Sequence, residues 1–482
     1  METPIHRAWI SGSSHDGGTG QPIEIINPWS GRRATRIQPA GLELVEAAVG
    51  AASQAFRRHR GTSIAERSAW LLNAAAEIEH ASESIIAATI ADIGKPRRAA
   101  RFEVDRSIAF LRACARSIHD VTGEVLPLDS AINGTGLYGF TRRVPYGVVA
   151  AVAPFNAPAN LLVQKLGPAL VTGNAIVAKP SIEGTRVALI IADCFTRAGL
   201  PDGLLNVLPG GSGEALALAA HRDTALVTLT GGVAAGEALA RAAGSKRFVG
   251  ELGGNSANVV CRDANLEDAV ARIVPSAFEA SGQQCISAQR LIVEAPVFHQ
   301  FLELFLAATR RLKIGDPDDI ETDLGPVVNL RAADRIELMI DDACARGARA
   351  ICGPNRKGCM IEPTIIVEAP EEARVVREEI FGPVVVVLPA RDLDDAIRLA
   401  NGSELGLQSS CFTNSLDTAY RVADALDVGS IWINEGSRFR LDNYPFGGMG
   451  RSGHGREGVR YAIEEYTQWK FTGVRLPPRS AA

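Results

Sequence analysis

Several common functional signatures are missing from the sequence. Its eight cysteines are scattered without a C-x-x-C pair, and there is no H-E-x-x-H motif and no histidine cluster with ligand spacing. These absences argue against a zinc ribbon and a disulfide framework, and we predict no metal site. A Walker phosphate loop is also missing, in keeping with the prediction of no metal site.

Long apolar stretches and charge of one sign are missing as well. No apolar run approaches the ~20 residues of a membrane-spanning helix, and residues 1–20 lack the apolar core of a secretion signal. The 50 Lys and Arg residues nearly balance 55 Asp and Glu residues, with the signs interspersed. We therefore predict no nucleic-acid or membrane partner. The scattered cysteines indicate a reducing compartment, so we predict a cytoplasmic protein.

What the sequence contains is a long chain of alternating secondary structure. Its 482 residues exceed what one hydrophobic core supports. After residues 1–30, which are rich in turn formers and are predicted to be irregular, a helical pattern extends from Leu42 to about His119, interrupted at Gly94-Lys95-Pro96. Strand and helix then alternate from Gly147 to about Gly250 and from Asn258 to about Asn434, which predicts parallel sheets covered by helices.

A β-hairpin is predicted between the first helices and the first alternating region. Residues Pro127 to Pro145 place Asn133-Gly134-Thr135-Gly136 between two strand-like runs. Because an isolated hairpin is only marginally stable, we expect it to pack on another element or on another subunit.

One short stretch, Ser281-Gly282-Gln283-Gln284-Cys285-Ile286-Ser287, contains the candidate nucleophile. Cys285 follows an apolar run from Ile273 to Phe278. Most free cysteines are inert core residues, and the reactivity of a thiol depends on its surroundings. Whether Cys285 is catalytic therefore depends on the residues that accompany it.

Four groups of polar residues fall at the ends of predicted strands, where open parallel sheets place ligand-binding groups. Asn156 could donate to an oxyanion, Lys179 could reach a ribose or phosphate, and Glu251 could act as a base if its pKa is raised. The alternatives are a turn asparagine, a solvated loop lysine and a solvated turn glutamate. The fourth group contains Glu379, a further carboxylate beside an aromatic residue. The alternative is that Glu379 only ends a helix before the next strand.

Together with Cys285, these groups resemble the motifs of the NAD(P)-dependent aldehyde dehydrogenase family over nearly the whole chain. Each motif is weak alone, but eight in family order and at family-like spacing argue against chance. They are Pro154-Phe155-Asn156, Lys179-Pro180-Ser181, Thr230-Gly231-Gly232, Glu251-Leu252-Gly253-Gly254, Gly282-Gln283-Gln284-Cys285, Glu379-Ile380-Phe381-Gly382-Pro383, Pro445-Phe446-Gly447-Gly448 and Gly455-Arg456-Glu457.

The resemblance implies an aldehyde dehydrogenase-like α/β fold with three parts. A Rossmann-type NAD(P)-binding domain would comprise residues 1–125 and 146–251, and an α/β catalytic domain would comprise residues 252–450. Residues 126–145 and 451–482 would form a small β oligomerisation element. Family members are dimers or tetramers whose sheets join through this element, so the resemblance implies a homodimer or homotetramer.

The same resemblance implies roles for five catalytic residues. Cys285 as thiolate would attack an aldehyde carbon, and Asn156 would hold the oxyanion with the backbone N–H of Cys285. After hydride transfer, Glu251 would activate the water that hydrolyses the thioester to a carboxylic acid. Lys165 and Glu457 match positions that support proton movement near this base.

A site for NAD or NADP is also implied. Lys179 would bind the adenosine ribose, and Glu379 and Phe381 would position the nicotinamide ribose and ring. The other implied cofactor-binding residues are Phe155, Ser181, Ile182, Gly211, Thr230, Gly231 and Gly232.

One departure leaves the choice of cofactor open. Many NAD-preferring members have a glutamate where this chain has Ile182, with Glu183 one place on. Without that glutamate a 2′-phosphate is tolerated more easily, and Arg186 or Lys179 could pair with it.

For the substrate, the resemblance implies a small polar or anionic aldehyde. Arg106 matches a tunnel-lining helix position that is often arginine in members acting on phosphorylated, phosphonate or carboxylate aldehydes. Arg438 and Arg440 lie in the segment that forms the tunnel mouth. The other implied substrate residues are Ala157, Asn160, Gln164, Gln284 and Phe446, and the small or polar ones at 157, 160 and 164 imply a roomy, polar pocket.

Other interpretations remain open at this point. Gln284 stands where some anion-specific members have a second arginine, and the pair Asn156-Ala157 also occurs in aromatic-aldehyde enzymes. The three arginines could also be surface groups that aid solubility. A CoA-acylating aldehyde dehydrogenase or an acyl-phosphate reductase usually lacks the base, so Glu251 argues against both. A catalytically silent homologue would be expected to have lost Cys285 or Asn156.

Overall fold

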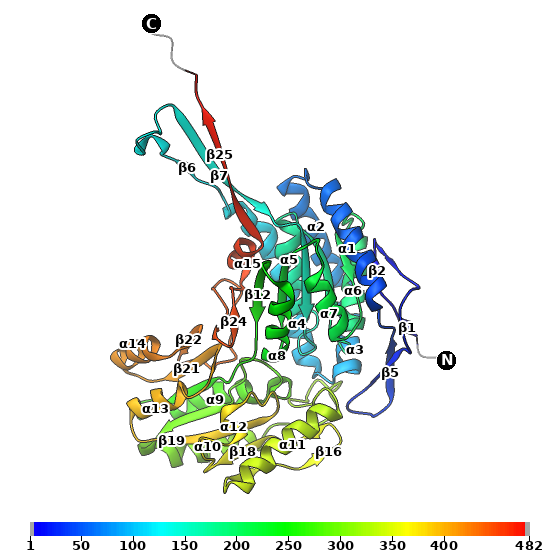
Figure 1. Ribbon diagram of the computed structural model, residues 1–482. Coiled ribbons are helices and arrows are strands. Elements are labelled where there is room, and N and C mark those ends of the chain that lie inside the picture. Colours follow the sequence, from blue (N-terminus) through cyan, green and yellow to red (C-terminus); the bar gives the residue numbers. More distant parts are fainter. Residues whose placement is uncertain (1–3, 478–482) are drawn as a thin grey trace.

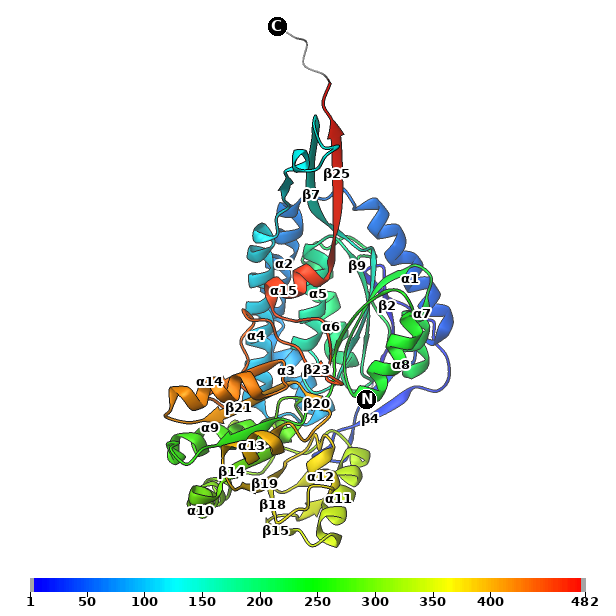
Figure 2. The same cartoon turned by 60° about the vertical axis from the view of Figure 1, so that its left-hand side comes forward.

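The computed structural model, which describes residues 4–477, contains two helix-covered β-sheets and a projecting β arm (Figures 1 and 2). The first sheet has eight strands. In spatial order they are β24 (Gly453–His454), β12 (Arg247–Glu251), β11 (Thr224–Thr230), β8 (Val148–Ala153), β9 (Ala175–Pro180), β10 (Leu205–Val207), β2 (Trp9–Ile10) and β3 (Ser13–Ser14). The strands from β12 to β10 are parallel, and β24 and β2 join them antiparallel.

Helices cover both faces of this sheet, so its central strands are apolar without alternation (Figure 2). Every residue of β8 and β9 is buried. One of the helices, α2, begins at a capping box, in which Ser63 and Glu66 exchange side-chain-to-backbone hydrogen bonds. The helices of this part are α1 (Gly41–Arg58), α2 (Ile64–His80), α3 (Ser82–Ile93), α4 (Arg97–Ser117), α5 (Asn160–Val171), α6 (Thr185–Arg197), α7 (Ser212–Ala220), α8 (Val233–Ala243) and α15 (Val459–Glu465).

The strand order creates a place where open parallel sheets bind ligands. From β8 the chain extends through β9 to β10, and then crosses back to place β11 and β12 on the other side of β8. The loops that leave the carboxyl ends of β8 and β11 therefore diverge. They contain residues 154–159, before α5, and residues 231–232, before α8.

The second sheet has seven strands and its own hydrophobic cores, and lies below the first in Figure 1. In spatial order the strands are β15 (Arg349–Cys352), β18 (Thr364–Val367), β19 (Val384–Ala390), β14 (Arg290–Glu294), β13 (Ala257–Val260), β21 (Gln408–Phe412) and β22 (Ser430–Ile433). Neighbours are parallel except β15 and β18. Its helices are α9 (Leu266–Phe278), α10 (Phe298–Thr309), α11 (Leu330–Ala345), α12 (Arg374–Arg377), α13 (Leu393–Ala400) and α14 (Leu416–Ala425).

The amino-terminal region differs from the prediction of an irregular segment. It contributes β2 and β3 to the first sheet, and β1 (Ile5–His6) and β4 (Ile23–Ile26) flank β5 (Arg33–Ile37) in a separate sheet. The reason is that β2 pairs with β10, whose residues lie far along the chain, and local turn signals do not reveal such a partner. Four further short strands form two ribbons: β16 (Arg356–Lys357) with β17 (Met360–Ile361), and β20 (Leu405–Gly406) with β23 (Met449–Gly450).

The projecting arm consists of β6 (Val125–Leu126), β7 (Leu137–Pro145) and β25 (Thr467–Arg475). The second strand of the predicted hairpin is β7, but its partner β6 has only two residues and lies before the predicted range, in which Leu128–Ser130 form a 3-10 turn. β7 pairs along its whole length with β25 instead. Large apolar side chains are exposed on this arm, namely Val125, Tyr138, Trp469, Phe471 and Val474.

The structure divides the region that was predicted as one carboxyl-terminal arm. β24 pairs with β12, and α15 packs on α4 and α5 with Val459 and Ile463 in the core of the first sheet. The arm therefore begins only at Thr467. Residues 1–3 and 478–482 of the predicted ranges lie outside the described part of the chain.

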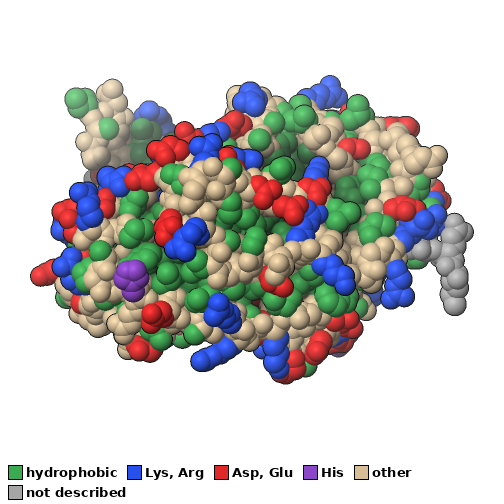
Figure 3. Space-filling view, turned by 90° about the horizontal axis from the view of Figure 1, so that it is seen from below, with side chains coloured by type: hydrophobic (Ala, Val, Ile, Leu, Met, Phe, Trp, Pro, Cys, Tyr) green, Lys and Arg blue, Asp and Glu red, His purple; other side chains and the backbone are tan. Residues whose placement is uncertain are grey.

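Charges of both signs are interspersed with apolar side chains on the face seen from below (Figure 3). Across residues 4–477, no helix is both long and apolar enough to cross a membrane. The same residues contain no cluster of three or more His, Cys, Asp or Glu side chains that could hold a metal ion.

Candidate active site

The candidate nucleophile lies in an anchored loop after α9. Three consecutive residues before it have left-handed backbone, Ala280 (φ 52°), Ser281 (φ 59°) and Gly282 (φ 66°). This conformation costs a non-glycine residue on the order of 1–3 kcal/mol, so surrounding contacts must hold it. Ser281 Oγ donates to the carbonyl of Gly325 at 2.7 Å. At Gly282 a Cβ would lie 2.1 Å from the carbonyl oxygen of Gly382, so only glycine fits there.

Cys285 is half-buried, and its backbone N–H has no acceptor among the described residues. Burial and then the charge of Glu379 raise the pKa of the Cys285 thiol to about 12, although Arg440 acts in the opposite direction. At neutral pH the thiol therefore holds its proton and needs a base before it can attack.

Asn156 lies beside this loop, just beyond the carboxyl end of β8. Its side-chain Nδ2 donates to the carbonyl of Gln283 at 2.8 Å. Because an amide nitrogen carries two N–H groups, the second one remains for a substrate oxygen. The bond to Gln283 thus orients an oxyanion donor near Cys285.

Glu251 ends β12 and is 2% exposed, and within residues 4–477 neither of its carboxylate oxygens has a hydrogen-bond partner. Burial and then the charge of Glu457 raise its pKa well above the usual value. The segment that follows touches the nucleophile loop, since a Cβ on Gly254 would lie 2.0 Å from the carbonyl oxygen of Cys285. The charge of Glu251 also contributes to the raised pKa of Cys285. The three predicted catalytic groups therefore meet in one place.

A buried network lies behind Glu251. Lys165 Nζ is 2.8 Å from Thr230 Oγ1 and 3.3 Å from Glu457 Oε1. Arg440 Nη2 donates to Glu457 Oε2 at 2.8 Å and to Gln164 Oε1 at 2.7 Å. Thr230, which was predicted to bind the cofactor, therefore directs its hydroxyl into this network.

The predicted cofactor residues line the carboxyl edge of the first sheet. Gly232 precedes the N-terminus of α8, which no side chain caps, and a Cβ on Gly232 would meet nothing within 4 Å. An uncapped helix N-terminus with open space suits a phosphate group. Lys179 is buried, and burial lowers its pKa while the charges of Glu214 and Glu183 oppose this. These residues fit a dinucleotide.

Other predicted cofactor residues lie where the nicotinamide ring was expected. Glu379 accepts the N–H of Gly254 at 3.0 Å, and burial raises its pKa to about 7. Phe155 and Phe381 meet edge to face, with ring centroids 5.8 Å apart. Gly231 donates its N–H to the carbonyl of Glu251 at 3.0 Å, which joins the cofactor loop to the base.

Two of the remaining predicted cofactor residues, Ser181 and Gly211, form hydrogen bonds with residues close to them in the sequence. Ser181 Oγ accepts the N–H of Gly184 at 3.0 Å, and the N–H of Gly211 donates to Glu214 at 2.8 Å. Ile182 is half-buried beside them.

One cation considered for a 2′-phosphate is not available. Arg186 forms two 2.8 Å bonds with Asp92, whose side chain is fully buried. The expectation for Arg186 is thus corrected, because a buried carboxylate already neutralises it. Glu183, the carboxylate one place after Ile182, accepts a hydrogen bond from Asn329 at 3.1 Å.

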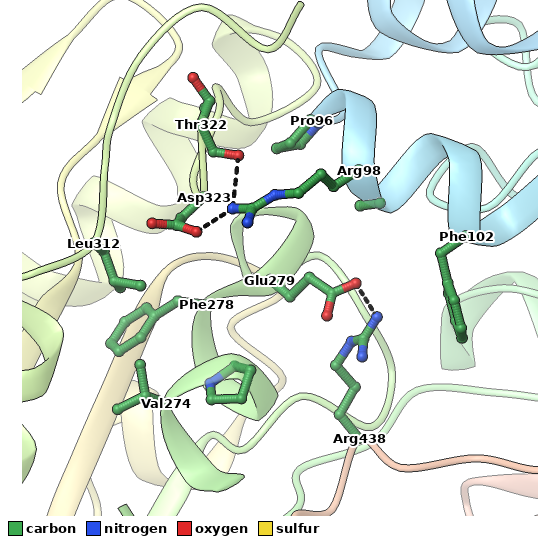
Figure 4. Close-up of a pocket in the computed structure, with 12 residues that line it drawn as sticks. Pro96, Arg98, Phe102, Val274, Phe278, Glu279, Leu312, Thr322, Asp323 and Arg438 are labelled. Carbon is green, nitrogen blue, oxygen red and sulfur yellow. Dashed lines mark hydrogen bonds and ion pairs between the residues drawn. The ribbon is translucent and has the colours of Figure 1, made fainter. Parts of the chain in front are cut away.

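The three predicted substrate arginines are not surface groups. Arg106 forms a two-bond ion pair with Asp442 at 2.5 and 3.0 Å, and Arg438 pairs with Glu279. Both pairs and Arg440 are largely buried, so the alternative that these arginines aid solubility is wrong. Figure 4 shows Arg438 and Glu279 in a pocket of about 410 Å³ between α4 and α9.

The other substrate positions surround unpartnered polar atoms. Four buried atoms have no hydrogen-bond partner in the described part of the chain: Asn160 Oδ1, Gln164 Nε2, Arg438 Nε and Arg440 Nε. The Arg440 guanidinium lies 3.7 Å from the ring centre of Phe446, in a cation–π contact. Ala157 and Gln284 are half-buried.

Sequence reasoning missed the acidic partners Glu279 and Asp442, and it missed a buried pair of Lys95 and Glu103. Lys95 was predicted only as part of a helix end. Nothing in the local sequence distinguishes these residues from solvated charges, because each meets its partner only in the folded chain.

Comparison with known proteins agrees with this geometry. A model of the aldehyde dehydrogenase family matches residues 15–472. The chain is 37% identical over 459 residues to 3-sulfolactaldehyde dehydrogenase of Priestia aryabhattai, covering 95% of this chain and 96% of that protein. Aldehyde dehydrogenase 21 of Physcomitrella patens, solved with its product succinate, has a TM-score of 0.94 at 33% identity, covering 98% and 99% of the two chains.

A third relative contains the cofactor. NADP-dependent glyceraldehyde-3-phosphate dehydrogenase of Bacillus halodurans C-125, solved with NADP, has a TM-score of 0.96 at 32% identity and covers 98% of this chain and 100% of that chain. The predicted fold class and the prediction of NAD or NADP are therefore confirmed. The chain belongs to the aldehyde dehydrogenase family and oxidises an aldehyde with NAD or NADP as the hydride acceptor.

Proposed function

We propose that Cys285, Asn156 and Glu251 carry out this oxidation and release a free carboxylic acid. Glu251 takes the proton of the Cys285 thiol, and the sulfur attacks the aldehyde carbon to form a thiohemiacetal. The free amide N–H of Asn156 and the backbone N–H of Cys285 hold the oxyanion. The bound cofactor supplies the hydride acceptor, and loss of hydride leaves a thioester on Cys285.

Glu251 then acts a second time. After its first proton has left to solvent by way of the network of Thr230, Lys165 and Glu457, it removes a proton from a water molecule. The resulting hydroxide attacks the thioester carbon, the C–S bond breaks, and the acid leaves.

The isolation of the Glu251 carboxylate carries this proposal. A buried polar group without a partner is costly, so a structural glutamate would be paired. Here neither oxygen has a partner among the described residues, and the half-buried thiol lies near it. A base for hydrolysis also argues against acyl transfer to CoA as the main reaction.

The test is to change Glu251→Gln and follow the first and later turnovers. At alkaline pH a fraction of the thiol ionises without a base, so we expect a first burst of reduced cofactor that reaches full amplitude, followed by slow later turnovers. Unchanged steady-state turnover would contradict the role of Glu251, and stimulation of the wild type by CoA would favour the acylating alternative. Cys285→Ala should abolish the burst, and Cys352→Ala, which removes another half-buried thiol, should retain it.

We also propose that the substrate is a small polar or anionic aldehyde. Burial, and less strongly the charge of Arg106, lower the pKa of Arg438, so two of the cations lie close together. Unpartnered donors on Arg438 and Arg440 can bind an anion. The names of the three relatives also indicate a sulfonate, a carboxylate and a phosphate.

Lactaldehyde and 3-sulfolactaldehyde share a skeleton and differ in one sulfonate, so they form a matched pair. We expect kcat/KM to favour the sulfonate by about tenfold or more, the effect of about one charge-assisted hydrogen bond. Arg438→Met should reduce this ratio, and Arg112→Met, at an exposed ion pair of α4, should not. A preference for benzaldehyde over both would support the aromatic alternative instead.

For the whole chain, we propose that the first sheet binds the cofactor and the second contributes the nucleophile. The arm would join a second copy of the chain in a homodimer or homotetramer. Its exposed apolar side chains support this assignment. The eight free cysteines support a cytoplasmic location.

A further inference from the structure

Lys95 and Glu103 form a buried ion pair that the proposed chemistry does not use. Lys95 Nζ lies 2.5 Å from Glu103 Oε2, and the two side chains are 7% and 4% exposed. Lys95 lies two residues before the start of α4, and Glu103 lies about two turns into that helix. Removing two charges from water is costly, and such a pair often contributes little net stability. The other hydrogen bonds of Lys95 and Glu103 indicate a second role for the pair.

Both side chains also bond to the backbone of the loop that contains Asn156. Lys95 Nζ donates to the carbonyl of Asn156 at 2.9 Å. Glu103 Oε1 accepts the N–H groups of Ala159 at 2.7 Å and Asn160 at 3.1 Å, at the start of α5. A carboxylate there also interacts favourably with the helix dipole. The pair therefore holds this loop at Asn156 and again three residues later.

The same region contacts the support of the nucleophile loop. A Cβ on Gly94 would lie 2.6 Å from the ring of Pro326, and one on Gly325 would lie 2.6 Å from the carbonyl oxygen of Gly94. Gly325 in turn accepts the hydrogen bond of Ser281. The backbone beside Lys95 therefore touches the segment that anchors the Cys285 loop.

A set of ion pairs reinforces this junction between the two sheets. Arg97 pairs with Asp318 at 2.6 Å, and Arg98 pairs with Asp323. The second pair is visible at the edge of the pocket in Figure 4. The oxyanion donor and the nucleophile come from different sheets, and the start of α4 contacts the supports of both.

We propose that Lys95 and Glu103 are positioning residues that set the Asn156 amide relative to Cys285. This inference rests on the proposed role of Asn156 as an oxyanion donor. Misplacement of a catalytic group by ~1 Å can cost ~100-fold in rate. Loss of the pair should therefore slow the step that Asn156 assists, without weakening cofactor binding.

The test compares Lys95→Met, Glu103→Gln and the double variant, each with and without Asn156→Ala. The double variant removes both charges, so no unpaired charge is buried, and the amide oxygen that Glu103→Gln introduces can still accept the N–H groups of Ala159 and Asn160. It carries the test if Lys95→Met does not fold. Arg112→Met is the control, since its ion pair with Glu79 lies on the exposed face of α4.

We expect the first-turnover rate of reduced cofactor to fall by about 10- to 100-fold in the Lys95 variants. In the Asn156→Ala background the same changes should slow the rate by less than about twofold, because residues that act as a unit are not additive. Cofactor affinity, measured by tryptophan fluorescence, should remain at the wild-type value.

Three results would overturn the inference. They are a normal first turnover in the folded double variant, an equal fold-loss with and without Asn156, and a loss explained by weaker cofactor binding. Failure of the proposed function is distinguishable, because the wild type would then form no reduced cofactor, or Asn156→Ala would leave the rate unchanged.

Discussion

Glu251 and Glu457 are both buried near Cys285, but their surroundings shift their pKa values in opposite directions. Burial and the charge of Glu457 raise the pKa of Glu251. Burial also acts to raise the pKa of Glu457, but the charges of Lys165 and Arg440 outweigh it, and the pKa is lowered. One carboxylate therefore stays ionised and the other readily takes a proton, which is the division of roles that proton transfer needs.

This coupling predicts the effect of Glu457→Gln on pH dependence. Glu251 is a base only when ionised, so thioester hydrolysis should increase as pH rises through its pKa. Removing the negative charge of Glu457 favours ionisation of Glu251 and should move the midpoint to lower pH. The measurement is the steady-state rate against pH, under conditions where hydrolysis is rate-limiting.

Glu464→Gln is the matched control, because this nearby carboxylate pairs with Arg460 at the surface. It should leave the midpoint in place. A midpoint that Glu457→Gln leaves unchanged, or moves upward, would contradict the coupling.

Among individual residues, the sequence allowed Cys285, Asn156 and Glu251 to be predicted, because each lies in a recognisable motif. It could not identify Lys95 and Glu103 as a buried pair. In the sequence they are ordinary helix charges, and their burial follows from the packing of α4 against the loop after β8.

Among secondary-structure elements, those of the first sheet were the most predictable. The alternation predicted from Gly147 to about Gly250 contains β11, Thr224–Thr230, because a short apolar run between turn residues has few other interpretations. The turn before Cys285 was not predictable. Ala280 and Ser281 rarely adopt left-handed backbone, and only contacts from distant segments hold them there.

The segment after Glu251 closely approaches the loop of Cys285, and this contact predicts the effect of Gly254→Ala. A Cβ at this position would lie 2.0 Å from the carbonyl oxygen of Cys285, so either the nucleophile loop or the segment after Glu251 must move. We expect a lower melting temperature and a first turnover slowed by about 100-fold. Thermal unfolding and single-turnover kinetics measure the two effects.

Gly213→Ala provides the control within a helix. Its added Cβ meets nothing within 4 Å, and alanine is a better helix former by ~1 kcal/mol. This variant should retain full activity and be equally or more stable. If Gly254→Ala behaved in the same way, the loop would be more tolerant than the structure indicates.

At the scale of the whole molecule, the projecting arm exposes apolar side chains that another surface is expected to cover. β7 and β25 form a long ribbon that projects away from the two large sheets (Figure 1). Trp469 and Phe471, one strand period apart, are 54% and 52% exposed. A narrow ribbon of this kind is marginal without further packing, so a second copy of the chain is expected to cover it.

Trp469→Asp with Phe471→Asp should therefore reduce the molar mass measured by light scattering. A buried charge at an interface is strongly unfavourable, whereas Lys470→Asp, at the exposed position between them, should keep the assembly. An unchanged mass in the double variant would place the interface elsewhere. The residue pattern predicted only the hairpin, and the family resemblance added the carboxyl-terminal segment. Local patterns could not do so, because the pairing of β7 with β25 joins segments more than 300 positions apart.

The return of the chain to its first sheet through β24 and α15 has a consequence for synthesis. The nucleophile is translated long before Glu457 and Arg440, which complete the environment of the general base. A ribosome must pass codon 457 before the reactive centre can close. Between codons 285 and 457 the emerging polypeptide therefore has its sulfur without the finished machinery that would let it react with metabolites.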